Sequence, residues 1–209
     1  MPSPEAITEY WRHAHAANDV KRLSGNGENT LDILMVRPVF ETARTMLNIG
    51  VGLGTLEHFC AGEVKVIDSL DVAPEARYKV EAAARNFFLE PGELPSSEYD
   101  LITECLVALH LTAEQMEEHI RNAVRALKPD GLYAFNAPDY ICYDEATVRQ
   151  QSHEEPTVAQ MNSGYSLCRS IPWYEMTARK SGALLALVAF SGIYRQYNAI
   201  HYVYHLRRA

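Results

Sequence analysis

The stretch Met46-Leu47-Asn48-Ile49-Gly50-Val51-Gly52-Leu53-Gly54 decides the fold of this 209-residue chain. It begins as a short apolar strand, ends in three alternating glycines, and leads into a segment suited to a helix. Because glycine has no Cβ, such a turn lets a ligand approach the backbone closely. The pattern therefore favours a ligand-binding turn, and the alternative is a tight turn that serves packing alone.

One acidic residue strengthens the ligand interpretation. Asp71 closes the second predicted strand, Val64 to Val72, and lies 21 residues after Gly50. A carboxylate at this place can accept hydrogen bonds from both hydroxyls of a ribose. The alternative is a solvated acid at a strand end. Taken together, the glycines and Asp71 favour the binding of a nucleoside.

The glycine spacing then separates two classes of cofactor. A dinucleotide fingerprint has glycine at its first, third and sixth positions, whereas the sixth position here is Thr55. Nothing basic follows that would suit a second phosphate. A ligand without a pyrophosphate therefore fits better, and a nicotinamide-dependent dehydrogenase is a third and weaker interpretation.

Short apolar strands alternate with helical segments through the middle of the chain, which predicts a parallel sheet with helices on its faces. Thr112 and Gln115 form a capping box for one helix, and Glu75 and Lys79 are spaced for an i,i+4 ion pair. The predicted strands are 46–49, 64–72, 99–106, 132–136, 184–190 and 199–206, and the predicted helices include 4–20, 75–86, 113–127 and 173–181.

Charge and composition limit the partners. The formal net charge is −8, and the longest basic cluster is Arg207-Arg208, so nucleic acid is not an expected substrate. No apolar run reaches the roughly 20 residues that span a bilayer, and the start of the chain lacks signal-peptide features. We expect no membrane association and a cytoplasmic location. The four cysteines and the paired histidines lack the spacing of metal ligands, so no metal is expected.

Four segments, in this order, resemble the class I S-adenosylmethionine-dependent methyltransferases, specifically their small-molecule branch. Each is moderately specific, and their order and spacing together are strong. The likeness runs from about Leu47 to Pro138. The segments are Leu47-Asn48-Ile49-Gly50-Val51-Gly52-Leu53-Gly54, Leu70-Asp71-Val72-Ala73-Pro74-Glu75, Tyr99-Asp100-Leu101-Ile102 and Leu127-Lys128-Pro129-Asp130-Gly131.

The resemblance implies a Rossmann-like α/β fold. Its sheet would have seven strands, mostly parallel, with an antiparallel last strand at 199–206 and helices on both faces. We expect a single methyltransferase-type domain of 1–209. It would comprise an N-terminal helical cap at 1–44, a donor-binding core at 45–138, a substrate lid at 139–170, and a C-terminal helix and strands at 171–209. Tyr140, Tyr143 and Tyr165 lie in the lid segment, where packing alone is the alternative role.

The resemblance also implies a role for each matched position. Gly50 and Gly52 would pass under the methionine and ribose parts of S-adenosylmethionine, and Asp71 would bind the ribose hydroxyls. Val72 would pack on the adenine, and Glu90 would lie near the adenine amino group. The predicted donor site comprises Asn48, Gly50, Val51, Gly52, Gly54, Asp71, Val72, Glu90 and Glu104.

Three of these assignments leave alternatives open. Asn48 stands where the family usually has an acid, so the donor's amino group loses a charged partner. Pro91 follows Glu90 and has no N–H, so a backbone bond that often reads the adenine ring is missing. Glu104 faces either the donor's amino group or the acceptor, and the competing role is a buried, satisfied acid.

His110 is the predicted catalytic residue. Methyl transfer needs a straight line and a short distance, and the remaining need is to remove a proton from the acceptor. His110 follows the predicted strand 99–106 at the lip of the cleft, and its unperturbed pKa near 6.5 suits a general base. The alternative is that His110 only packs, or hydrogen-bonds, near the start of the next helix.

The leading hypothesis is methyl transfer from S-adenosylmethionine to an oxygen or nitrogen of a small metabolite, sugar or natural-product intermediate. Acidic charge and the tyrosine segment motivate this substrate class. The second hypothesis is a non-catalytic protein of the same fold that binds S-adenosylmethionine or a protein partner, and Asn48 and Pro91 motivate it. The sequence does not set the oligomeric state, and a homodimer is one option.

Overall fold

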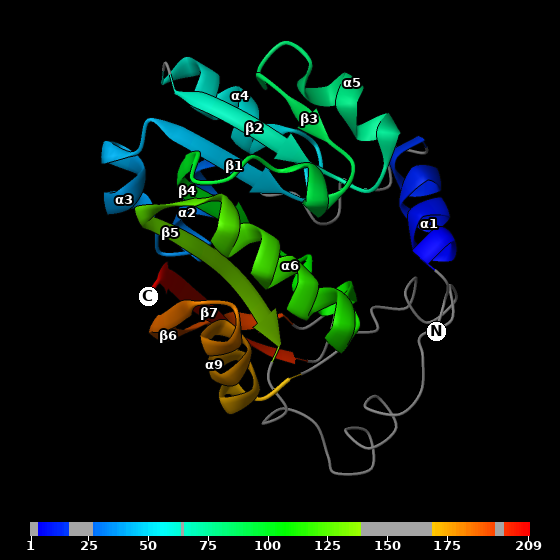
Figure 1. The fold of residues 1–209 in the computed structure, drawn as a ribbon. Coiled ribbons are helices and arrows are strands. Elements are labelled where there is room, and N and C mark those ends of the chain that lie inside the picture. Colours follow the sequence, from blue (N-terminus) through cyan, green and yellow to red (C-terminus); the bar gives the residue numbers. More distant parts are fainter. Residues whose placement is uncertain (1–3, 17–26, 64, 139–168, 195–198) are drawn as a thin grey trace.

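Seven strands form one sheet in the computed structural model, which describes residues 4–16, 27–63, 65–138, 169–194 and 199–209. The strand order is β3-β2-β1-β4-β5-β7-β6. The strands are β1 (Thr45–Ile49), β2 (Val66–Leu70), β3 (Phe87–Phe88), β4 (Tyr99–Glu104), β5 (Leu127–Pro138), β6 (Ala183–Tyr194) and β7 (Ala199–Arg208). β1 to β5 pair in parallel, whereas β7 is antiparallel to both of its neighbours. The predicted α/β sheet with an antiparallel last strand is confirmed (Figure 1).

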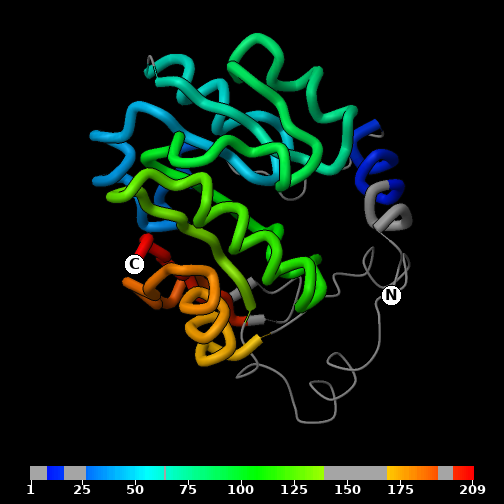
Figure 2. The backbone as a smooth tube through the Cα atoms, in the orientation of Figure 1, coloured from blue at the N-terminus to red at the C-terminus, as the bar shows by residue number. Residues whose placement is uncertain are grey.

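Helices cover both faces of this sheet because side chains alternate along each strand. Leu47 on β1 belongs to a core cluster with residues of α6 and α9, whereas Met46 belongs to a second cluster with residues of α2, α3 and α4. The helices are α1 (Pro4–Ala16), α2 (Gly27–Ile33), α3 (Arg37–Thr42), α4 (Thr55–Gly62), α5 (Arg77–Val80), α6 (Ala113–Ala126) and α9 (Ile171–Lys180), and the short turns η2 (Pro74–Ala76), η3 (Pro91–Glu93) and η4 (Ala108–His110) connect them to strands. The backbone path is clearest in Figure 2.

The capping box of α6 forms as predicted. The Thr112 hydroxyl accepts from the Gln115 backbone N–H at 3.3 Å, and the Gln115 side chain accepts from the Thr112 N–H at 2.9 Å. Met116, Ile120 and Val124 are buried along one face of the helix. A satisfied first turn and an apolar stripe are what a helix of this kind needs.

The helix predicted over 75–86 is wrong in its length. The chain instead forms η2 and the single turn of α5, because Arg85 and Asn86 are drawn to Asp68 on β2. The Arg85 guanidinium donates to both Asp68 oxygens at 3.0 and 2.6 Å, and the Asn86 backbone N–H donates at 3.0 Å. A buried carboxylate requires such partners, and this requirement outweighs helix propensity. The predicted pair of Glu75 with Lys79 is also replaced, because Glu75 accepts from Arg12 of α1.

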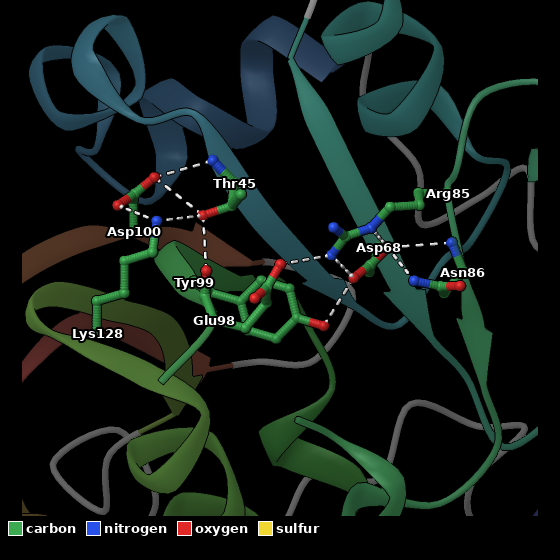
Figure 3. A network of polar contacts seen from close by, with 8 residues as sticks. All are labelled: Thr45, Asp68, Arg85, Asn86, Glu98, Tyr99, Asp100 and Lys128. Atoms are coloured by element: carbon green, nitrogen blue, oxygen red, sulfur yellow. Dashed lines mark hydrogen bonds and ion pairs between the residues drawn. The ribbon is translucent and has the colours of Figure 1, made fainter. Parts of the chain in front are cut away.

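Two carboxylates, Asp68 and Asp100, link strands of the sheet (Figure 3). Asp68 also accepts from the Tyr99 hydroxyl at 2.8 Å, which links β2 to β4. Asp100 on β4 accepts from the backbone N–H groups of Arg44 and Thr45 and from Lys128 of β5, all at 2.9 Å. Burial acts to raise the pKa of Asp100, but these hydrogen bonds lower it to about 2. Asp100 is therefore ionised and ties β1, β4 and β5 together.

β7, which carries His201 and His205, is an internal strand of the sheet. β7 lies between β5 and β6, which places both histidines in the interior. His205 contacts the Leu34 carbonyl through Nε2 at 2.7 Å. The alternation of side chains along β7 fits either an edge strand or a central strand, and only the order of strands in the sheet decides between them.

The helices before β1 lie in two different places relative to the sheet. α2, α3 and the turn between them pack on the sheet face through Leu31, Phe40 and Leu34, whereas α1 lies at the end of the sheet to which β1 and β2 point (Figure 1). The proposed lid at 139–170, with Tyr140, Tyr143 and Tyr165, falls outside the described residues except for Arg169 and Ser170. The division of the chain at 45, 139 and 171 stays a prediction. Within the described ranges, none of the helices combines the length and the apolar character needed to span a membrane.

Candidate functional site

The glycine turn after β1 requires glycine for two reasons. Gly50, Gly52 and Gly54 have φ of 80°, 57° and 75°, a left-handed region that disfavours other residues. A Cβ on Gly50 would also stand 2.3 Å from Val107 Cγ2, in the loop that follows β4. Gly54 caps α4, and a Cβ there would stand 2.9 Å from the Lys79 carbonyl. Left-handed backbone and close protein packing therefore both require glycine at Gly50 and Gly54.

Asp71 lies directly beside this turn. Its Oδ2 accepts from the Val51 N–H at 2.9 Å, and its Oδ1 accepts from the Ala73 N–H at 2.9 Å. A carboxylate has about four acceptor positions, so each oxygen keeps capacity for a further donor. Asp71 is only 8% exposed. The predicted pairing of the glycine turn with an acid after β2 therefore exists in three dimensions.

Val72 and Glu90 flank Asp71 at neighbouring strand ends. Val72 is partly exposed, and the Asp71 N–H donates to the Phe88 carbonyl at 3.1 Å, which joins this end to β3. Glu90 is exposed two residues beyond β3, where its N–H donates to the Glu93 carboxylate at 3.2 Å. The structure brings both predicted adenine contacts to the same edge as Asp71, and their roles stay predictions.

Asn48 is committed to α4. Its Nδ2 donates to Glu57 Oε1 at 2.9 Å, and its Oδ1 accepts from the Thr103 hydroxyl at 3.3 Å. Ser69 donates to the same Glu57 oxygen at 2.9 Å. Burial raises the pKa of Glu57. Glu57 was not predicted from the sequence, although a carboxylate among the apolar residues of a short helix indicates a buried acid.

Glu104 ends β4 as a fully buried acid. It accepts from the Tyr133 hydroxyl and lies 3.0 Å from His119 Nε2, while its Oε1 has no hydrogen-bond partner among the described residues. Burial raises the pKa of Tyr133 well above its ordinary value, and the Glu104 charge raises it further. Glu104 is therefore a buried acid with a hydrogen bond at only one of its two oxygens among the described residues, and its contact with the donor stays a prediction.

His110 lies in the turn η4, just beyond the loop that covers Gly50. It is 9% exposed, and neither ring nitrogen has a hydrogen-bond partner among the described residues. Burial lowers the pKa of His110 to about 4. The Trp11 ring of α1 meets the imidazole edge-on, with ring centroids 5.0 Å apart. His110 is thus a neutral imidazole whose lone pair meets no donor among the residues that the structure describes.

Hydrogen bonds from two residues outside the loop, Asn136 and Arg169, hold the loop that carries His110. The Leu106 N–H donates to Asn136 Oδ1 at 2.7 Å, and Leu106 has φ of 60°. Arg169, itself buried, donates to the carbonyls of Ala108 and Leu111, which bracket His110. Sequence reasoning did not find Arg169, because its role depends on packing between segments about 60 residues apart. The rigid turn holds the imidazole at one place.

The fold and the site together define a class I methyltransferase-type domain. Residues 47–135 match the family model described as a methyltransferase domain. Residues 47–135 are therefore a methyltransferase domain, and this match supports S-adenosylmethionine as the methyl donor. Comparison with curated proteins gives no match.

Solved structures of low sequence identity share the fold. A methyltransferase from Leishmania major has a TM-score of 0.66 at 19% identity, over 99% of this chain and 85% of its own. Magnesium protoporphyrin IX methyltransferase from Synechocystis PCC 6803, with bound SAH, has a TM-score of 0.63 at 11% identity, over 97% and 98%. Mitomycin 7-O-methyltransferase has a TM-score of 0.57 at 19% identity, over 81% of this chain and 50% of its own.

Proposed function

We propose that this protein transfers the methyl group of S-adenosylmethionine to an oxygen or nitrogen of a small metabolite, sugar or natural-product intermediate, with His110 as the general base. The observation that carries the proposal is the buried imidazole of His110, whose two nitrogens have no hydrogen-bond partner in the described part of the chain, just beyond the loop that contacts Gly50. Buried polar nitrogens are nearly always hydrogen-bonded, so a histidine without a partner among the described residues is a candidate for completion by a ligand.

The residues around the turn fit S-adenosylmethionine. Its sulfonium supplies an already activated methyl group. The left-handed glycines give its methionine and ribose parts close access to the backbone, and Val51 and Gly54 complete the turn. Asp71 keeps the free lone pairs needed for two ribose hydroxyls, and Val72 and Glu90 stand where adenine would lie. We assign Asn48 and Glu104, at the ends of the neighbouring strands β1 and β4, to the methionine part of S-adenosylmethionine.

Burial makes His110 of the free protein a weaker base than the pKa near 6.5 expected from the sequence, but it keeps the ring unprotonated. With a pKa near 4, its imidazole is neutral and its lone pair is available over the whole physiological range. It takes the proton that the acceptor oxygen or nitrogen loses as it gains the methyl group. The fixed turn and the edge of Trp11 restrict the ring to one orientation, which favours proximity catalysis.

The acceptor class rests on charge and on the structural neighbours. A net charge of −8 disfavours nucleic acid, and two neighbours carry names of small-molecule methyltransferases. A small-molecule acceptor therefore remains our proposal, together with a cytoplasmic location. A homodimer is compatible with these observations, and the proposed chemistry does not depend on it.

The test uses methyl-labelled S-adenosylmethionine and fractions of a metabolite extract. We expect label to enter a small product with the parent protein, and to fall with Asp71→Ala and with His110→Ala. Incorporation into nucleic acid or protein instead would refute the acceptor class. Donor binding without any labelled product would support the second hypothesis, a non-catalytic protein of this fold.

A further inference from the structure

Helix α1 contacts both the turn η2 that follows Asp71 and the turn η4 that carries His110. Arg12 donates to Glu75 Oε1 at 3.0 Å in η2, four residues after Asp71. One residue earlier on α1, Trp11 meets the ring of His110. These contacts tie α1 to η2 and η4, at the end of the sheet to which β1 and β2 point (Figure 1).

The residue of α1 that faces Asp71 is His15. It is 5% exposed, and its Nε2 lies 3.6 Å from Asp71 Oδ2. Its Nδ1 lies 3.1 Å from Lys79 Nζ. An ammonium group has donors only, so Nδ1 accepts and the hydrogen of a neutral ring is on Nε2. His15 therefore directs an N–H toward the carboxylate.

The gap between His15 and Asp71 is longer than a hydrogen bond. At 3.6 Å the two atoms do not satisfy one another directly, while Asp71 Oδ2 is already bound by the Val51 N–H. A hydroxyl group both donates and accepts, and it can serve a carboxylate and an N–H at once. The pair is thus matched to an alcohol rather than to a cation or an anion.

We infer that His15 is a second ribose-binding residue, which acts opposite Asp71. One ribose hydroxyl of the donor donates to Asp71 and accepts from His15 Nε2–H, and Lys79 holds the tautomer that makes this possible. The inference rests on the proposed role of Asp71 and extends the donor site to a helix outside the matched domain. The competing account is that His15 fills the ribose position and must leave before the donor binds.

Calorimetric titration with S-adenosylhomocysteine separates these accounts. We expect His15→Ala to weaken binding by about three- to tenfold, the size of one net hydrogen bond. His15→Gln, which keeps an N–H near the same place, should stay within about threefold of the parent. The control is His13→Ala, because His13 is on the same helix but 80% exposed. Unchanged or tighter binding by His15→Ala would overturn the inference.

Analogues of S-adenosylhomocysteine distinguish a specific ribose contact from a nonspecific effect of His15→Ala on the packing of α1. The titrations are repeated with 2′-deoxy and 3′-deoxy S-adenosylhomocysteine. The cost of His15→Ala should vanish for the analogue that lacks the contacted hydroxyl and persist for the other. An equal loss with both analogues would mean that His15 only packs α1, and would also overturn the inference. If the parent binds none of the three ligands, the donor role of Asp71 fails instead.

Discussion

Val107 rests on Gly50, so the loop after β4 seats directly on the glycine turn after β1. Replacing Gly50 by alanine places a Cβ 2.3 Å from Val107 Cγ2, at a φ of 80°. We expect Gly50→Ala to lower the free energy of unfolding by about 2–4 kcal/mol, from the left-handed backbone and the overlap together. Donor binding should also be lost, because the turn must shift. Chemical denaturation and calorimetry measure the two effects.

Gly62→Ala is the matched control. Gly62 ends α4, and a Cβ there meets nothing within 4 Å. Alanine in a helix is favoured over glycine by up to about 1 kcal/mol, so this variant should be equally or slightly more stable. If Gly50→Ala behaved like Gly62→Ala, the contact between Val107 and the turn would be unimportant.

The lowered pKa of Asp100 predicts that part of the free energy of unfolding is lost in acid. Its pKa is lowered to about 2 in the folded protein, so its contribution is complete above the unfolded pKa near 4 and is lost as pH falls toward 2. We expect the parent to be more stable than Asp100→Asn by about 1–2 kcal/mol at pH 6, with the difference shrinking below pH 4. Urea denaturation at several pH values measures it. A difference independent of pH would contradict the ionised role of Asp100.

His110→Ala separates catalysis from donor binding. With an acceptor from the labelling screen, we expect the rate to fall by about a hundredfold or more while S-adenosylhomocysteine affinity stays within about threefold. The rate of the parent should fall as pH drops through the pKa of His110, since protonation removes the accepting lone pair. Because that pKa is about 4 in the free protein, the loss should appear only in acid.

The alternative for His110 gives the reverse result. If the side chain only packs against Trp11, the alanine variant should melt earlier but turn over normally with the parental pH profile. That outcome would remove His110 from the mechanism and leave proximity, with Glu104 or water as the proton acceptor.

The core of the fold could be predicted from local pattern. The strand before the glycine turn and the helix capped by Thr112 form as expected, because alternation and capping are properties of adjacent residues. The helix after Pro74 was overextended, because Arg85 and Asn86 serve a buried carboxylate on another strand. Strand β3 is only two residues long and left no periodic signal. The position of β7 inside the sheet likewise depends on long-range order.

The site was predictable only where its residues lie in the matched segments. The glycine turn and Asp71 meet as expected, since both follow from the ends of adjacent parallel strands. Glu57, His15 and Arg169 were missed, because helix packing brings them to the site from outside those segments. His15 and Arg169 are polar residues that become buried, and burial of a single polar residue is not visible in a sequence.

Titration of the parent and Asp71→Ala with S-adenosylhomocysteine tests the central claim most directly. In Asp71→Ala, two ribose hydroxyls of the ligand would lose their charged acceptor. We therefore predict saturable binding by the parent and binding weaker by about 1–3 kcal/mol in the variant. Asp71→Asn, which keeps one acceptor oxygen, should fall between them. Thermal melting of each variant controls for folding, because Asp71 also accepts from Val51 and Ala73. Absence of saturable binding by the parent at millimolar ligand, or an unchanged dissociation constant in a folded Asp71→Ala, would contradict the assigned donor site.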